Sequence, residues 1–146
     1  MMRYRFIDDI VTLHTREPAT IEVRKTFAPG DDALTGPLGP HRVPNSLLLE
    51  LLAMTGGHLV FHCLDRGRLP LLLKVQECVF EGSVRPGVPL RVRASLNGVD
   101  RAAEPTVVAE TSGEILSEGA PVARARLLFV CVSVPDVDLA AFGALQ

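Results

Sequence analysis

The stretch from Asn45 to Gly67, NSLLLELLAMTGGHLVFHCLDRG, constrains the fold more than any other segment of the chain. Its first two residues, asparagine and serine, are common helix N-caps, and its closing Arg-Gly pair is typical of a helix end. Between these ends the predicted helix is apolar on nearly every side. Such a helix is buried in a protein or in a membrane, and the titratable residues Glu50, His58 and His62 favour a protein interior. The rest of the chain must therefore surround it.

Five other segments have the composition of β-strands. They are Ile21–Phe27, Leu69–Phe80, Val88–Leu96, Thr106–Leu116 and Pro121–Val132. The first and third alternate apolar and polar residues with a period of two, which is typical of a strand with one buried face. The turns between the last four strands are rich in glycine and proline. The opening segment, Tyr4–Leu13, is compatible with a short helix or with a strand.

The predicted order of elements is a strand, a loop, one long buried helix and four consecutive strands with short turns. This order predicts an antiparallel sheet curled around a central helix. This α+β arrangement is the hot-dog fold. A single domain over residues 1–146 accounts for it, because domains commonly contain roughly 100 to 200 residues. The mean hydropathy of +0.26 is high for a chain with so small an interior. We therefore expect a homodimer or a higher homo-oligomer.

Charge and cysteine content exclude several classes of protein. The net charge is -2 and no run of five or six like charges occurs, so nucleic-acid binding is disfavoured. Three widely separated cysteines argue against a disulfide framework and for a reducing compartment. Two aspartates interrupt the N-terminal apolar residues, and no run of about 18 apolar residues occurs, which predicts neither a signal peptide nor a membrane span. We expect a cytoplasmic protein with no nucleic-acid or membrane partner.

Glu50 is the residue in the predicted helix that most requires an explanation. It stands between Leu49 and Leu51, and carboxylates are seldom buried without a partner. Burial removes a carboxylate from water and disfavours its charged form, so a buried Glu50 would be suited to general acid or base catalysis near neutral pH. The structural alternative is a glutamate that pairs with an arginine or faces solvent.

The start of the same helix supplies hydrogen-bond donors. Backbone N–H groups near Asn45, Ser46 and Leu47 lack partners within the helix and carry the positive end of its dipole. They could polarise a carbonyl oxygen. Together with Glu50 they form a minimal site for chemistry on a carbonyl compound.

The string VPNSLLLELLAMTGG resembles the helix-start motif of the 3-hydroxyacyl-acyl-carrier-protein dehydratases, PGVLxxEAMAQ. Pro44 and Glu50 occupy the positions of the proline and of the catalytic acid. RFIDDIV is similar to the N-terminal segment of that family, FEGSVRPGVPLRV to one of its strand pairs, and the last two strands to its closing hairpin. The resemblance implies a hot-dog homodimer that acts on an acyl-carrier-protein or coenzyme A thioester in fatty-acid or polyketide-type biosynthesis, with neither cofactor nor metal.

The sequence departs from this family at the second catalytic residue. The family uses a histidine from a G-H-F-P loop, contributed by the other subunit, together with the helix carboxylate. Here the corresponding loop reads LTGPLGPHRVP, so the histidine position falls on Gly36 or Pro37, and neither side chain carries a proton. Met54 replaces the family's glutamine and Asn45 its glycine. His41 is the titratable loop residue that could substitute for the missing histidine.

Three functions follow from these residues. The first is a dehydratase with Glu50 and His41 as catalytic groups and with Asn45, Ser46, Leu47, Met54, Gly36 and Pro37 around the substrate. The second is a hot-dog thioesterase, in which a single helix carboxylate activates water. The third is a non-catalytic subunit that binds an acyl thioester. An assay that detects removal of water, release of thiol, or binding without turnover would distinguish these three functions.

Two further groups of residues have functional and structural interpretations. Arg91 and Arg93 on one predicted strand, and Arg124 and Arg126 on another, could form a basic surface that binds acyl carrier protein, or simply a solvated strand face. His58 and His62 have the i, i+4 spacing of metal ligands. No third ligand stands at a recognisable distance, so packed core histidines are the favoured interpretation and no metal is expected.

Overall fold

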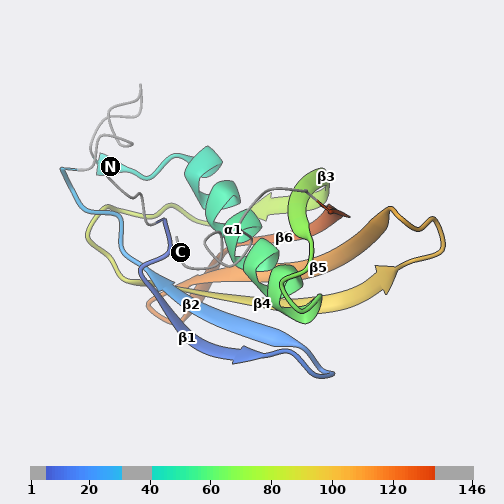
Figure 1. Cartoon of the computed structure of the whole chain (residues 1–146). Coiled ribbons are helices and arrows are strands. Elements are labelled where there is room, and N and C mark those ends of the chain that lie inside the picture. Colours follow the sequence, from blue (N-terminus) through green and yellow to red (C-terminus); the bar gives the residue numbers. More distant parts are fainter. Residues whose placement is uncertain (1–5, 31–40, 134–146) are drawn as a thin grey trace.

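A computed structural model describes residues 6–30 and 41–133 of the chain. Within these residues a single helix lies against one antiparallel sheet (Figure 1). The elements are β1 (Asp9–His14), β2 (Thr20–Lys25), α1 (Asn45–Cys63), β3 (Leu69–Phe80), β4 (Leu90–Asp100), β5 (Val107–Ser117) and β6 (Ala120–Val132). The predicted hot-dog fold is confirmed.

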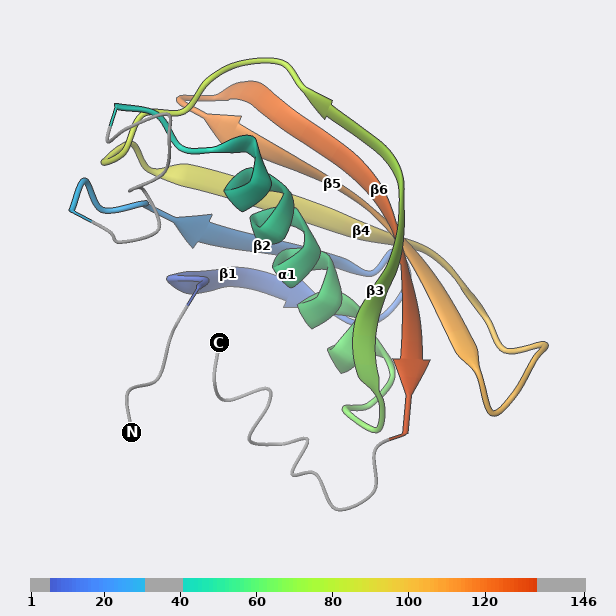
Figure 2. The same cartoon turned by 90° about the horizontal axis from the view of Figure 1, so that it is seen from above.

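The sheet contains six strands in the order β1-β2-β4-β5-β6-β3. Every neighbouring pair is antiparallel. Seen from above, the sheet curls around α1, with β1 and β3 at its two edges (Figure 2). The first strand after the helix, β3, therefore lies far from β2 in the sheet and pairs along one side only, with β6.

The predicted helix and strands match the observed elements closely, with differences at their ends. The helix begins at Asn45, but its N-cap is Pro44, so the prediction that Asn45 or Ser46 caps it is wrong. It ends at Cys63, because Asp65 and Arg66 adopt positive φ angles of 57° and 58°. The N–H of Arg66 then donates to the carbonyl of Phe61 (2.9 Å) and closes the last turn. Of the opening segment Tyr4–Leu13, for which helix and strand were both compatible, residues 9–13 belong to β1.

The core lies between α1 and the inner face of the sheet. Alternate residues of β2, β4, β5 and β6 point inward, as the period of two predicts. The inward residues with the lowest exposure include Val23, Val92, Ala109, Ile115 and Ala123. They pack against Leu48, Leu51, Leu52 and Leu59 of α1. By length and composition α1 could also cross a membrane, but half of it is buried inside the described structure, as in a core helix.

Glycine allows α1 to approach the sheet closely at one point. A Cβ atom on Gly56 would lie 2.7 Å from Oγ1 of Thr111 on β5 and 3.3 Å from the ring of Phe129 on β6. Gly57, the next residue, has room, because a Cβ there would meet nothing closer than the Phe129 ring at 3.6 Å. A side chain is therefore sterically excluded at position 56 but has room at position 57.

We predict that Gly56→Ala destabilises the protein by about 1 to 3 kcal/mol, because overpacking forces Thr111 and Phe129 to shift. Gly57→Ala is the matched control. It gains about 1 kcal/mol of helix propensity without a clash, so it should be neutral or stabilising. Chemical denaturation of both variants measures the difference. Equal stability of the two variants would show that α1 does not approach the sheet this closely.

Candidate functional site

The start of α1 is held in place by backbone contacts. The N–H of Val43 donates to the carbonyl of Val84, which follows β3 (2.8 Å). Val43, Val84 and Leu48 are each at most 1% exposed. The first turn of the helix is thus fixed against the segment that leaves β3, and any group that this turn presents has a defined direction.

The first turn leaves two backbone donors available. The carbonyl of Pro44 accepts hydrogen bonds from the N–H groups of Leu47 (3.0 Å) and Leu48 (3.3 Å), and no side chain caps the helix. The N–H groups of Asn45 and Ser46 have no hydrogen-bond partner among the described residues. Leu47 was expected to contribute a free amide and does not, because the tight first turn already uses it. Asn45 and Ser46 remain as donors at the positive end of the helix dipole.

Glu50 is exposed in the single chain. The expectation that Glu50 is buried is therefore wrong, because the sheet covers α1 on its inner sides and leaves this side open. Within the described residues Glu50 forms no hydrogen bond or ion pair. The structural alternative of pairing with an arginine is excluded there, whereas the alternative of a solvent-facing glutamate fits the single chain.

Ser46, Glu50 and Met54 stand at four-residue intervals and so share one side of α1. Leu47 and Met54 are half-buried and pack against the core. The free amides of Asn45 and Ser46 lie one turn before the Glu50 carboxylate on the same helix. The helix thus brings together most of the predicted site residues: two donors, one unpaired carboxylate and an apolar border.

The loop residues do not complete this group in the structure. His41 is exposed in a short turn before α1 and forms no hydrogen bond with Glu50. Gly36 and Pro37, predicted to lie near the substrate, fall outside the described residues. The described portion of the site therefore holds one carboxylate and no second group for proton transfer.

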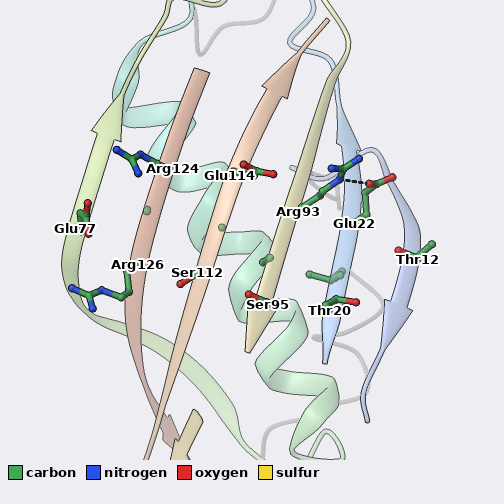
Figure 3. Close-up of a pocket in the computed structure, with 14 residues that line it drawn as sticks. Thr12, Thr20, Glu22, Glu77, Arg93, Ser95, Ser112, Glu114, Arg124 and Arg126 are labelled. Atoms are coloured by element: carbon green, nitrogen blue, oxygen red, sulfur yellow. Dashed lines mark hydrogen bonds and ion pairs between the residues drawn. The ribbon is translucent and has the colours of Figure 1, made fainter. Parts of the chain in front are cut away.

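Two hollows occur on the opposite, outer face of the sheet, away from Glu50. One of them is a groove of about 650 Å³ that crosses β2, β4, β5 and β6 (Figure 3). Three arginines and three glutamates line it, together with the hydroxyl groups of Ser95 and Ser112. The second, also about 650 Å³, adjoins it beside Arg91 and Leu116. Glu50 lines neither of them.

The outer face is not the basic surface that the arginine pattern suggested. Arg91 and Arg93 both donate to Glu22 on β2, each at 2.8 Å, and Arg124 pairs with Glu81 at 2.9 Å. The hydrogen bond from Arg93 and the charges of both arginines hold the pKa of Glu22 below its usual range. Sequence reasoning missed Glu22, although the alternation of Ile21–Phe27 had placed it on the polar side of its strand.

The histidines of α1 form no metal site with other described residues, where no group of three ligand-type side chains occurs. His58 is 2% exposed, and its ring stacks on that of His62 with centroids 6.2 Å apart. Burial, and then the charge of Arg66, lower the pKa of His62. The interpretation as packed core histidines agrees with this arrangement.

Comparison with known proteins yields structural neighbours only. No protein-family model and no curated protein sequence matches the chain. Among solved structures, a proposed thioesterase of Lactococcus lactis, yhdA, has a TM-score of 0.71 at 11% identity, covering 88% of this chain and 94% of that one. A proposed thioesterase of Ralstonia eutropha, related to phenylacetic acid degradation, has a TM-score of 0.68 at 24% identity, with coverages of 83% and 82%.

A hypothetical thioesterase of Streptococcus pneumoniae, solved with coenzyme A, has a TM-score of 0.66 at 13% identity and covers 86% of this chain and 85% of that one. The TM-scores show that these proteins share the hot-dog fold with the chain, and at identities this low they show the fold alone. They give no support to the narrower resemblance to acyl-carrier-protein dehydratases, because the neighbours are named as thioesterases.

The lowered pKa of His62 predicts how stability depends on pH. The unfolded chain takes up a proton at His62 as the pH falls through about 6.5, whereas the folded chain resists it down to a lower pH. The unfolded state thus binds more protons in this window, and stability falls as the pH falls. We predict that His62→Gln reduces this loss between pH 7 and pH 5, as measured by urea unfolding. The exposed His14→Gln should leave it unchanged, and equal pH dependence in all three proteins would contradict the prediction.

Proposed function

We propose that the chain is a hot-dog thioesterase that hydrolyses acyl-coenzyme A, with Glu50 as the general base. The observation that carries this proposal is the unpaired Glu50 carboxylate on the same helix as the free N–H groups of Asn45 and Ser46, one turn away. A thioesterase reaction needs only these two kinds of group. We further propose that the activity is cytoplasmic.

The reaction follows from the chemistry of the two groups. The N–H groups of Asn45 and Ser46 donate to the thioester carbonyl oxygen and stabilise the negative charge that develops on it, helped by the helix dipole. Glu50 accepts a proton from a water molecule whose oxygen attacks the carbonyl carbon. The carbon–sulfur bond then breaks, and the thiolate leaves with the proton returned by Glu50. The products are a carboxylic acid and free coenzyme A.

Hydrolysis fits the described residues better than dehydration does. Dehydration in the resembled family uses a histidine together with the carboxylate, and here Gly36 or Pro37 holds the histidine position. His41, the substitute, forms no hydrogen bond with Glu50. Several neighbours in fold are named as thioesterases, one of which was solved with coenzyme A, and a further neighbour, smu.793 of Streptococcus mutans, was solved with acetyl coenzyme A. Coenzyme A is therefore preferred to acyl carrier protein as the carrier.

We propose that the active form is a homodimer assembled through β3. This strand is an edge of the sheet, and Leu71, Leu72, Leu73 and Val75 on it are 46%, 44%, 56% and 36% exposed. A long apolar edge with unpaired backbone groups favours pairing with another strand. A Cβ atom on Gly57, two turns after Glu50 on the same side of α1, would meet Phe129 of β6 at 3.6 Å and Pro70 of β3 at 4.0 Å. A second copy on β3 would therefore lie next to the side of α1 that holds Glu50 and exclude water from it.

We predict that Glu50→Gln lowers kcat/KM for acyl-coenzyme A hydrolysis by about 10² to 10⁴, the usual contribution of a general base. Free thiol is measured with acyl chains of several lengths, and mass analysis of 3-hydroxyacyl thioesters detects loss of water. Glu118→Gln, an exposed glutamate in the turn between β5 and β6, is the control and should keep full activity. Loss of water in place of thiol release, binding without turnover, or full activity of Glu50→Gln would each contradict the proposal.

We predict that Leu73→Lys shifts the protein toward the monomer, because a charge on the apolar edge opposes strand pairing. Light scattering over a range of concentrations measures the mass. Val99→Lys on β4, another exposed apolar position, is the matched control and should behave as the original protein does. A β3 interface is excluded if both variants have the same mass at every concentration.

A further inference from the structure

The glycine at position 57 is not explained by the packing of the fold. It lies in the middle of α1, where a glycine destabilises the helix relative to alanine. Gly56 is explained by its close approach to Thr111, but a Cβ on Gly57 would meet Phe129 at 3.6 Å and Pro70 at 4.0 Å, which are ordinary contact distances. Gly57 is also only half-buried. Its missing side chain therefore leaves open a surface of α1 that the fold itself does not use.

This open surface continues the side of α1 that carries the Glu50 carboxylate. Glu50, Met54, Gly57 and Phe61 are separated by three or four residues, so they share one side of the helix. Met54 and Gly57 are half-buried, whereas Phe61 is 0% exposed. The side is therefore open from Glu50 to Gly57, apolar beyond Glu50, and closed at Phe61.

The strand β3 adds apolar side chains next to this side of α1. The register pairs Leu72 with Phe129 and Val75 with Leu127. Opposite residues of an antiparallel pair share a face of the sheet, and Phe129 and Leu127 are buried in the core, so Leu72 and Val75 lie on the inner face. They are nevertheless 44% and 36% exposed, because α1 does not cover this part of the sheet. After the helix ends, β3 runs back beside it (Figure 2).

Met54 and Gly57 of α1 and Leu72 and Val75 of β3 together form an apolar strip that begins at Glu50. In the proposed reaction the thioester carbonyl lies at this end of the strip. Of the two groups attached to that carbonyl, coenzyme A carries charged phosphates and the acyl chain carries none. The acyl chain is therefore the group that gains from apolar contact, and each methylene removed from water strengthens binding by up to about fourfold.

The length of the strip determines how long a chain it can hold. With a rise of about 1.5 Å per residue, Gly57 lies about 10 Å and Phe61 about 16 Å beyond Glu50 along α1. Carbon–carbon bonds of about 1.5 Å advance an extended acyl chain by about 1.25 Å per carbon. Such a chain reaches the level of Gly57 with about 8 carbons and that of Phe61 with about 13.

We propose that Gly57 is a specificity-determining residue and that the substrate carries an acyl chain of medium length, about 8 to 13 carbons, which lies on the apolar strip. This inference rests on the proposed hydrolysis at Glu50. A shorter chain stops before Gly57 and leaves part of the strip in water. A longer chain extends beyond Phe61, where the side of the helix is closed. A side chain at position 57 would occupy the space that the acyl chain needs.

Substitution of Gly57 tests this inference with butanoyl-, octanoyl-, dodecanoyl- and hexadecanoyl-coenzyme A. For the original protein kcat/KM for thiol release should rise by about tenfold or more from the butanoyl to the octanoyl substrate and fall for the hexadecanoyl substrate. Gly57→Leu should lower the ratio of kcat/KM for dodecanoyl to that for butanoyl by about tenfold or more, and Gly57→Ala by about fourfold. Gly98→Leu is the matched control, because Gly98 is exposed and a Cβ there meets nothing within 4 Å, and it should keep the original ratio.

Binding separates this inference from the proposed hydrolysis. Thermal unfolding shows that each variant folds, and calorimetry measures binding of the same four thioesters to the Glu50→Gln chain, with and without Gly57→Leu. If the original protein releases no thiol, the proposed function fails, but tighter binding of the octanoyl and dodecanoyl thioesters that Gly57→Leu removes would still support the apolar strip. If thiol is released with equal kcat/KM for all four chains, or with the same ratio in Gly57→Leu as in the original protein, the inference is overturned and hydrolysis by Glu50 stands.

Discussion

The close contact between α1 and the sheet is the constraint on which the rest of the molecule depends. A helix that is apolar on nearly all sides needs a partner on nearly all sides, and one twisted sheet provides this by curling around it. The contact is closest where Gly56 meets Thr111 and Phe129, at a distance that leaves no room for a Cβ atom. Because the sheet is fitted to the helix there, the position of the helix start follows from the packing of the core.

The same contact determines which groups are available for chemistry. The sheet covers the inner sides of α1 and leaves one side half-exposed, and the free amides and the Glu50 carboxylate occur at the beginning of that side. Pro44 contributes by ending the loop with a residue whose carbonyl satisfies the amides of Leu47 and Leu48. With no side chain capping the helix, the donors of Asn45 and Ser46 remain available to a substrate. A capping serine or aspartate at position 44 would compete with a substrate for the N–H of Ser46.

The fold was predictable from the sequence because periodicity records which face of an element is buried, and the largely apolar stretch Leu47–Phe61 allowed one architecture only. The exposure of Glu50 was not predictable, since the composition around a residue does not reveal which side of its helix the sheet leaves open. The partners of Arg91 and Arg93 were also missed. Both bind Glu22, which is 69 or 71 residues distant in sequence, and only the strand register brings them together.

The exposed surfaces of the sheet differ in the partners that they can accept. The β3 edge offers apolar side chains and unpaired backbone groups. Another strand could therefore bind it through backbone hydrogen bonds and through burial of apolar surface. The outer face offers charges that largely pair within the chain, Arg91 and Arg93 with Glu22 and Arg124 with Glu81. An apolar edge alone would pair with any exposed strand. We therefore expect association through the apolar β3 edge rather than through the charged outer face.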